Sequence, residues 1–308
     1  MRIIFFGTSQ FAVPSLERLA KRHEIALCVT QPDRPQGRGL QPEPSPVKRA
    51  AERLDLTLAQ PPQLLPEQFA SLKPELGIVI AYGRLISRDL LAVPAHGMLG
   101  VHPSLLPKYR GAAPVAWALL NGERTTGVTI FRLSERLDDG DILRQQTVPV
   151  EPGEDAEQLT GRLAQLGAEE LASGVDAIAS GQASFTPQDD AEATLAPKLT
   201  KAQGRIDWSQ SAETIERLVR GTTPWPGAVT EWEGTPVKIL KAAADLRSTT
   251  ASPGCVLGKA ADGLLVAAGK GTLRITELQP AGKRRMSVKE FLASRVLKAR
   301  SRFGSRHA

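Results

Sequence analysis

A histidine and an acidic turn are the residues best suited to acid–base chemistry in this chain. His102 follows a short apolar stretch and precedes a loop stiffened by Pro103 and Pro107. The acidic glycine turn of residues 137–141 contains Asp138. A carboxylate beside an imidazole fixes its tautomer and raises its pKa, as a general acid or base requires. The residues alone leave two interpretations open: a catalytic pair, or a hydrogen-bonded histidine at a strand end and a solvated turn.

The elements around His102 predict an open α/β sheet. Residues 76–82 form an apolar run typical of a buried parallel strand, and residues 98–101 predict the next strand. His102 would then lie at a carboxyl end, where open α/β sheets bind ligands. The chain also opens as strand, turn, helix and strand over residues 2–30. It has one glycine, Gly7, where the dinucleotide fingerprint G-x-G-x-x-G needs three, which argues against a nicotinamide enzyme.

The second half of the chain predicts a small barrel with a basic surface. Five short β-like segments follow one another between residues 228 and 278. Residues 205–308 contain 18 Lys and Arg against 9 Asp and Glu, whereas residues 1–204 contain 21 against 24. This asymmetry indicates a module that binds a polyanion attached to a catalytic module, or simply a solubilising surface. Residues 31–46 form a long loop rich in proline and glycine, a length typical of functional loops.

The composition of the chain leads to expectations about its location in the cell and about metal binding. The 308 residues are 41% apolar, and no stretch reaches the roughly 20 apolar residues that cross a bilayer. The chain begins without a signal pattern, so we expect a cytoplasmic protein that has no contact with membranes and is a monomer. Cys28 and Cys255 lie far apart, and no Cys/His cluster has the spacing of metal ligands, so we expect no metal.

The loop that begins at His102 resembles the signature of a known family. Residues 102–114 read His-Pro-Ser-Leu-Leu-Pro-Lys-Tyr-Arg-Gly-Ala-Ala-Pro, which is similar to the signature loop of methionyl-tRNA formyltransferases. Residues 31–39, 205–208, 224–226 and 279–283 resemble further landmarks of that family in order along nearly the whole chain.

The resemblance implies the fold and its boundaries. It implies an α/β class, with an N-terminal Rossmann-like formyltransferase domain and a mostly parallel sheet over residues 1–182. A linker over residues 183–204 and a smaller OB-like β-barrel over residues 205–308, which would bind tRNA, complete the expected organisation.

The resemblance also implies the reaction and its catalytic residues. The family transfers formyl from 10-formyltetrahydrofolate, its co-substrate, to the amino group of initiator methionyl-tRNA, with no metal. Its triad is Asn-x-His with a later Asp: His102 and Asp138 match, but Gly100 stands at the Asn position. We therefore expect that Asp138 favours the charged form of His102, that activity is reduced, and that Gly100→Asn raises turnover.

Binding residues follow from the same resemblance. Ser104, Leu105, Leu106 and Pro107 match the folate-contacting loop. The residues expected to contact tRNA are basic: Arg34, Arg38, Lys198, Lys201, Lys283, Arg284 and Arg285. Two alternatives remain open, namely a formyltransferase of the same fold that acts on a sugar or nucleotide amine, and a non-catalytic RNA-binding relative. Trp208, Trp225 and Trp232 are expected to pack in the core or at a hinge.

Overall fold

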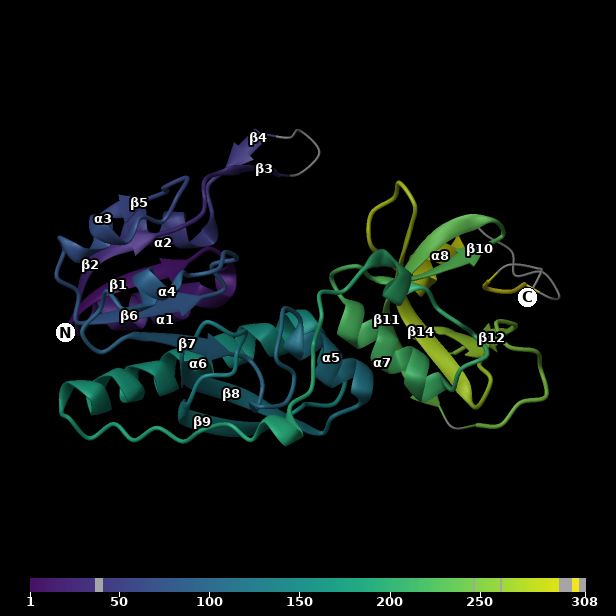
Figure 1. Cartoon of the computed structure of the whole chain (residues 1–308). Helices are drawn as coiled ribbons and strands as arrows, with labels where there is room; N and C mark the ends of the chain where they lie inside the picture. The colour runs from purple at the N-terminus through teal and green to yellow at the C-terminus, as the bar shows by residue number, and fades with distance from the viewer. Residues whose placement is uncertain (37–40, 246, 261, 294–300, 305–308) are drawn as a thin grey trace. The chain divides into compact units, whose positions relative to one another are not determined.

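A computed structural model describes residues 1–36, 41–245, 247–260, 262–293 and 301–304 (Figure 1). The chain forms two compact units, each assembled from more than one stretch of sequence. Unit 1 consists of Met1–Pro114, Thr125–Pro149 and Thr160–Pro197, and unit 2 of Val115–Arg124, Val150–Leu159 and Lys198–Ala308.

Unit 1 is built on a seven-stranded sheet with the order β5-β2-β1-β6-β7-β8-β9. Its strands are β1 (Arg2–Gly7), β2 (Glu24–Val29), β5 (Leu58–Ala59), β6 (Leu76–Ile80), β7 (Met98–His102), β8 (Thr125–Arg132) and β9 (Ile142–Pro149). The first five strands in this order pair in parallel, and β8 and β9 continue the sheet antiparallel. The prediction of a mostly parallel α/β sheet is therefore confirmed.

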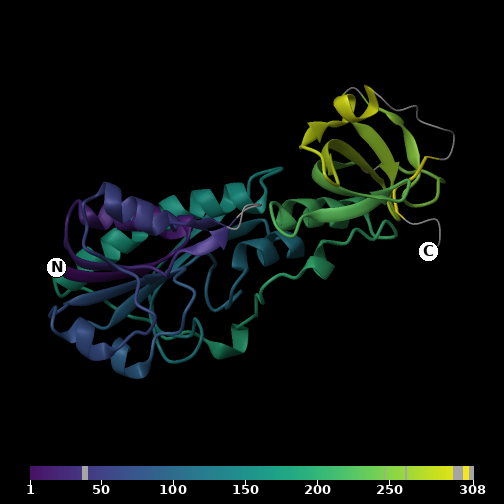
Figure 2. The same ribbon diagram turned by 90° about the horizontal axis from the view of Figure 1, so that it is seen from above.

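Both faces of this sheet are covered by helices. Helices α1 (Val13–Ala20), α2 (Pro46–Arg53) and α6 (Ala156–Ala179) lie on one side, and α3 (Pro66–Ala70) and α4 (Arg88–Leu91) lie on the other (Figure 2). Strand β1 shows the consequence, since Ile3 and Phe5 belong to the core of the first side and Ile4 and Phe6 to that of the second. Burying such a side chain contributes about 1.5–3 kcal/mol, so β1 fixes both layers.

One local feature differs from the expectation for residues 31–46. The segment contains a short antiparallel hairpin, β3 (Arg34–Gln36) with β4 (Gln41–Glu43), rather than an irregular loop. Helix α2 follows immediately, because the Ser45 side chain accepts from the Lys48 N–H and Pro46 occupies the first turn.

Unit 2 contains a separate, antiparallel sheet. Its strands are β10 (Ala228–Trp232), β11 (Thr235–Asp245), β14 (Thr272–Pro280), β13 (Leu264–Ala267) and β12 (Val256–Lys259) in spatial order, with β15 (Met286–Ser287) beside β14. Residues 301–304 bond to both edges, since Gly304 N–H donates to the carbonyl of Glu231 in β10 and Phe303 N–H donates to the carbonyl of Gly254 ahead of β12. This closure confirms the barrel prediction, because it removes the open edges of the sheet.

Helices and aromatic rings complete unit 2. Helices α5 (Pro114–Asn121), α7 (Ala212–Thr222) and α8 (Val288–Ala293) belong almost wholly to it. Trp208 and Trp232 pack around Phe303 with ring centroids 5.7 and 4.7 Å away. Trp225 is 49% exposed and does not pack in the core, so only the hinge alternative of its prediction stays open. Across the described part of the chain, no helix has the length and apolar character to span a membrane.

Candidate active site

His102 ends β7, and the sheet fixes the position of its side chain. Strand β7 pairs with β6 on one side and β8 on the other, with His102 opposite Thr129. The imidazole is 6% exposed. Its Nε2 lies 2.8 Å from the backbone carbonyl oxygen of Tyr109. Because a carbonyl only accepts, Nε2 carries the proton and donates it, so the neutral ring holds its lone pair on Nδ1.

The loop after β7 is folded against the sheet so that it presents this carbonyl. The Thr129 hydroxyl donates to the carbonyl of Ser104 at 2.7 Å and accepts from the Leu106 N–H at 3.1 Å. The Ser104 hydroxyl donates to the Lys108 carbonyl at 2.6 Å. Tyr109 then adopts a left-handed backbone, with φ of 62°, which is uncommon for a residue with a large side chain. The loop therefore closes over the ring of His102 instead of leaving it open to solvent.

Asp138 comes from the turn between β8 and β9 and faces the other ring nitrogen. Its backbone is also left-handed, with φ of 53°, a conformation that Asp tolerates better than most residues. Oδ2 of Asp138 lies 3.7 Å from Nδ1 of His102, beyond hydrogen-bond distance. The same oxygen accepts from the Gly111 N–H at 2.9 Å. The structure thus brings together His102 and Asp138 as the sequence predicts.

Burial decides the protonation state of His102. Desolvation lowers the pKa of the imidazole most strongly, whereas the Asp138 carboxylate and the hydrogen bond to Tyr109 raise it, and the net direction is below the ordinary value. Asp138 therefore favours the charged form of His102, as expected, but burial outweighs this effect. The ring is neutral near pH 7, and the carboxylate stands ready to stabilise a proton gained at Nδ1.

Gly100 lies two residues before His102 and faces an aromatic ring. It pairs across the sheet with Phe131 of β8. A Cβ at position 100 would come within 2.6 Å of that ring. Phe131 also meets His102 edge-on, with ring centroids 6.4 Å apart and planes at 88°. The position at which the resemblance leads one to expect an amide is therefore closed by Phe131, which sequence patterns did not single out.

The residues expected to contact folate belong to the same loop. Ser104 and Leu106 are buried, and Leu105 and Pro107 are half-buried. Gln145 of β9 donates to the carbonyl of Leu106 at 2.9 Å and so fixes the loop from the neighbouring strand.

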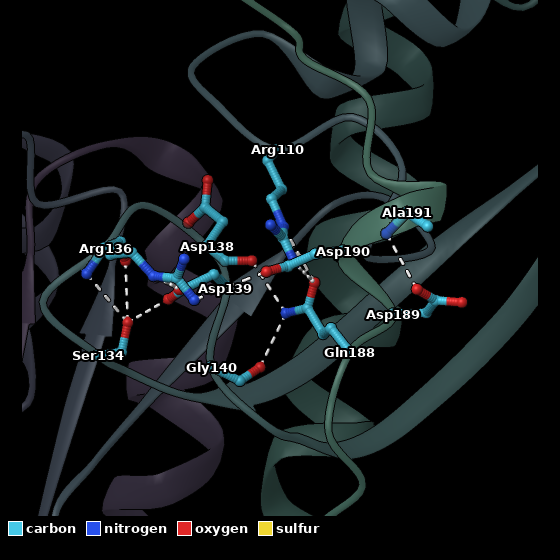
Figure 3. Close-up of polar contacts among 10 residues, drawn as sticks. All are labelled: Arg110, Ser134, Arg136, Asp138, Asp139, Gly140, Gln188, Asp189, Asp190 and Ala191. Carbon is cyan, nitrogen blue, oxygen red and sulfur yellow. Dashed lines mark hydrogen bonds and ion pairs between the residues drawn. The ribbon is translucent and has the colours of Figure 1, made fainter.

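Sequence reasoning missed a third contributor, Gln188. It lies in the stretch predicted as a linker, yet residues up to Pro197 belong to unit 1. Gln188 lies between the Arg110 side chain and the backbone of the turn that carries Asp138 (Figure 3). Only the Pro-Gln dipeptide at residues 187–188 marks the position in the sequence, which is too weak a signal to find it.

Five of the seven basic residues expected to bind tRNA are exposed. Lys198 and Lys201 are exposed, as are Lys283, Arg284 and Arg285. Arg284 pairs with Glu290 at 2.6 Å, and Arg285 pairs with Glu277. The Arg284 guanidinium and the Ser287 donors lower the pKa of Glu290 to about 2. The cluster is therefore opposed by two carboxylates, those of Glu277 and Glu290.

Two further expected residues lie in the hairpin segment. Arg34 lies on β3, and Arg38 lies outside the described residues. Among the residues that the structure describes, no group of three or more His, Cys, Asp or Glu side chains has an arrangement that could hold a metal ion.

The fold and this site define an α/β enzyme with a buried imidazole–carboxylate pair for acid–base chemistry. Residues 1–175 match the family model described as Formyl transferase, and residues 198–296 match that described as Formyl transferase, C-terminal domain. The chain belongs to the formyl transferase family.

Individual relatives and solved structures are similar to this chain over most of its length. The methionyl-tRNA formyltransferase of Geobacter metallireducens is 43% identical over 309 residues, which cover 99% of this chain and 99% of the relative. That of Roseiflexus castenholzii is 47% identical over 293 residues, covering 92% and 93%. Among solved structures, an N-formyltransferase from Helicobacter canadensis complexed with folinic acid and dTDP-3-aminofucose superposes with a TM-score of 0.68 at 16% identity, covering 92% of this chain and 99% of that chain. HypX from Aquifex aeolicus with tetrahydrofolic acid gives 0.64 at 21% identity, covering 95% and 47%. Likeness at such low identity shows the fold alone.

Proposed function

We propose that this chain transfers a formyl group from 10-formyltetrahydrofolate to the amino group of initiator methionyl-tRNA. The observation that carries the proposal is the buried pair of His102 and Asp138 at the end of β7, in a chain 43% identical over nearly its full length to a methionyl-tRNA formyltransferase. The folate supplies an activated formyl carbonyl when it is bound.

Residues of the site can accept and return the protons that this reaction transfers. The amine that attacks the formyl carbon loses a proton, and the nitrogen that leaves that carbon gains one. His102 is neutral with its lone pair on Nδ1, so it can accept a proton there as a general base. The imidazolium then has the Asp138 carboxylate 3.7 Å from Nδ1, and a group of this kind can return the proton to the departing nitrogen.

The folate would be held by the loop after His102. We assign this contact to Ser104, Leu105, Leu106 and Pro107, whose backbone is fixed by Thr129. Leu137, which precedes Asp138, is 61% exposed and so offers apolar surface for an aromatic ring system beside the catalytic turn.

Gly100 determines how fast a turnover we expect. With glycine at position 100 there is no side-chain donor for the developing oxyanion, and the loss of one such donor typically costs about 10²–10³ in turnover. We propose that the chain turns over correspondingly slowly, with Phe131 filling the space above Gly100.

The acceptor tRNA would be bound by basic residues outside the catalytic pair. We assign this contact to Arg34, Arg38, Lys198, Lys201, Lys283, Arg284 and Arg285, with residues 205–308 as the tRNA-binding domain. We further propose that the protein works as a cytoplasmic monomer.

A single-turnover assay tests the proposal. The purified chain is mixed with 10-formyltetrahydrofolate and initiator methionyl-tRNA, with elongator methionyl-tRNA and an aminated nucleotide sugar as competing acceptors. Formylation of the initiator tRNA that is lost in His102→Gln supports the proposal. Formylation of the sugar amine alone would favour the alternative acceptor, and folate binding without any turnover would favour a non-catalytic relative.

A further inference from the structure

The stretch of residues 186–196 runs along both loops that carry the catalytic pair. At one end it forms a bridge with the first residue of β9, since the N–H of Ile142 and that of Thr186 each donate to the other's carbonyl. At the other end, Thr194 accepts from the Tyr109 N–H through its hydroxyl and from the Arg110 N–H through its carbonyl, both at 2.8 Å. We call residues 186–196 the strap.

Gln188 connects the strap to the turn that bears Asp138. Its Nε2 donates to the backbone carbonyl of Asp138 at 2.9 Å and to that of Gly140 at 2.8 Å. Its Oε1 accepts two hydrogen bonds from Arg110, at 3.1 and 2.8 Å. Both amide hydrogens and the amide oxygen are used, so the hydrogen bonds define a single orientation of the side chain (Figure 3).

Arg110 ties the same amide to the loop that covers His102. Its side chain is 11% exposed and also pairs with Asp190 at 2.7 Å. Arg110 follows Tyr109, whose carbonyl accepts from His102, and precedes Gly111, whose N–H donates to Asp138. One amide side chain therefore connects the loop and the turn that meet at the two nitrogens of the imidazole.

We propose that Gln188 is a positioning residue that holds the backbone of the Asp138 turn so that its carboxylate faces Nδ1 of His102. The inference deepens the proposed function, because it concerns the same catalytic pair. Two donations, to the carbonyls of Asp138 and Gly140, stabilise the left-handed backbone that Asp138 adopts. A glutamate could still accept from Arg110, but it would set a carboxylate oxygen against two carbonyl oxygens.

Two substitutions of Gln188 and one matched control separate positioning from general stability. Gln188→Met keeps the volume and removes every hydrogen bond, and Gln188→Glu keeps the Arg110 contact alone. Asp189→Ala is the control: the Asp189 carboxylate accepts from the Ala191 N–H within the strap and thereby caps a short 3-10 turn. It stabilises the strap without touching the turn, and Asp189 lies directly beside Gln188 in the chain.

The readouts are the turnover number and the titration of the His102 ring by NMR in the substrate-free chain. The groups acting on the pKa of His102 are the Asp138 carboxylate, from the turn, and the Tyr109 carbonyl, from the loop; both raise it against burial. We expect both Gln188 variants to lower kcat by about 10-fold to 100-fold with KM for both substrates retained, as for a misplacement of about 1 Å. We also expect the pKa of His102 to fall further, because the carboxylate moves away.

The control fixes the interpretation of these results. Asp189→Ala should lower the melting temperature while leaving kcat and the His102 titration in place. Either Gln188 variant titrating and turning over like Asp189→Ala would overturn the proposal. If Gln188→Met does not fold, Gln188→Glu decides the question alone, because its ion pair with Arg110 keeps the strap anchored. The NMR titration needs no substrate, so a shifted pKa in a chain that formylates nothing would retain the positioning and reject the proposed function.

Discussion

Replacing Gly100 by Asn tests whether a side chain at position 100 can act as a donor to the oxyanion. From sequence alone, Gly100→Asn is expected to raise turnover, because it restores the amide at the position two residues before His102. The structure changes this expectation. Phe131 lies opposite Gly100 on β8 and is 4% exposed, so no free volume awaits an added side chain.

The size of the destabilisation follows from the distances between an added Cβ at position 100 and its neighbours. A Cβ at position 100 would lie 2.6 and 2.9 Å from two carbons of the Phe131 ring and 2.9 Å from Cδ1 of Leu133. These are closer than van der Waals contact, so both side chains must move. Overpacking of this kind destabilises a core by about 1–3 kcal/mol. Each kcal/mol lowers the melting temperature of a domain of about 150–250 residues by about 2–4 °C. We therefore expect Gly100→Asn alone to be less stable and no faster.

A second substitution makes room for the amide. Phe131→Ala alone should cost about 3–5 kcal/mol, because it leaves a cavity beside His102. Adding Gly100→Asn to Phe131→Ala fills part of that cavity, so the double variant should be more stable than the sum of the single changes predicts. Within the Phe131→Ala background, Asn at position 100 should raise kcat towards the factor of about 10²–10³ that one oxyanion donor is worth.

Urea unfolding and single-turnover formylation of all four proteins provide the measurement. The cycle yields one coupling free energy for stability and one for turnover, and both should be favourable. A Gly100→Asn protein that is as stable as its parent and turns over at least tenfold faster would refute the reasoning, since it would mean that Phe131 moves aside without cost.

Four further predictions concern pH, the hairpin and the basic cluster. The pKa of His102 is lower in the folded chain than its unfolded value of about 6.5, so the unfolded chain binds the proton first and stability falls as pH drops below about 6.5. The free energy of unfolding of His102→Gln, measured in urea, should therefore depend less on pH between 7 and 5. An unchanged dependence would point to another group. Arg34→Ala should lower tRNA affinity at an unchanged melting temperature, whereas a loss of several degrees with normal formylation would make the residue structural. Alanine at all of residues 283–285 should weaken tRNA binding and reduce its logarithmic salt slope by up to about 0.7–0.9 per lost contact, with folate binding as the control. Glu290→Gln should strengthen tRNA binding, because it releases Arg284; equal affinity would show that the ion pair does not compete with phosphate.

The approach of Asp138 to His102 was predictable from residue patterns, because it depends mostly on local sequence. The apolar run before His102 predicts a strand whatever the rest of the chain does, and a residue at its end must lie at the carboxyl edge of the sheet. The turn with Asp138 follows the next strand of the chain, so its approach to His102 depends on β8 lying beside β7. The chain meets that condition.

The environment of these residues was not predictable in the same way. The contact of Gly100 with Phe131 depends on the register of two antiparallel strands, and a slip of one residue would turn Phe131 to the other face. The pKa of His102 depends on the loop that covers it, which closes through left-handed backbone at Tyr109. Neither property follows from the spacing of His102 and Asp138.

The strap shows why composition misled the assignment of a linker. Residues 183–204 are polar and poor in large apolar side chains, which is typical of a segment without a core of its own. In the structure, residues 186–196 use polar groups instead, because their partners are backbone carbonyls and N–H groups of two catalytic loops that need hydrogen bonds when covered. A segment that forms hydrogen bonds with covered backbone groups must itself contain polar groups. The polar side chain of Gln188 is therefore typical of a linker in the sequence, and the same polar side chain holds the turn of Asp138 in the fold.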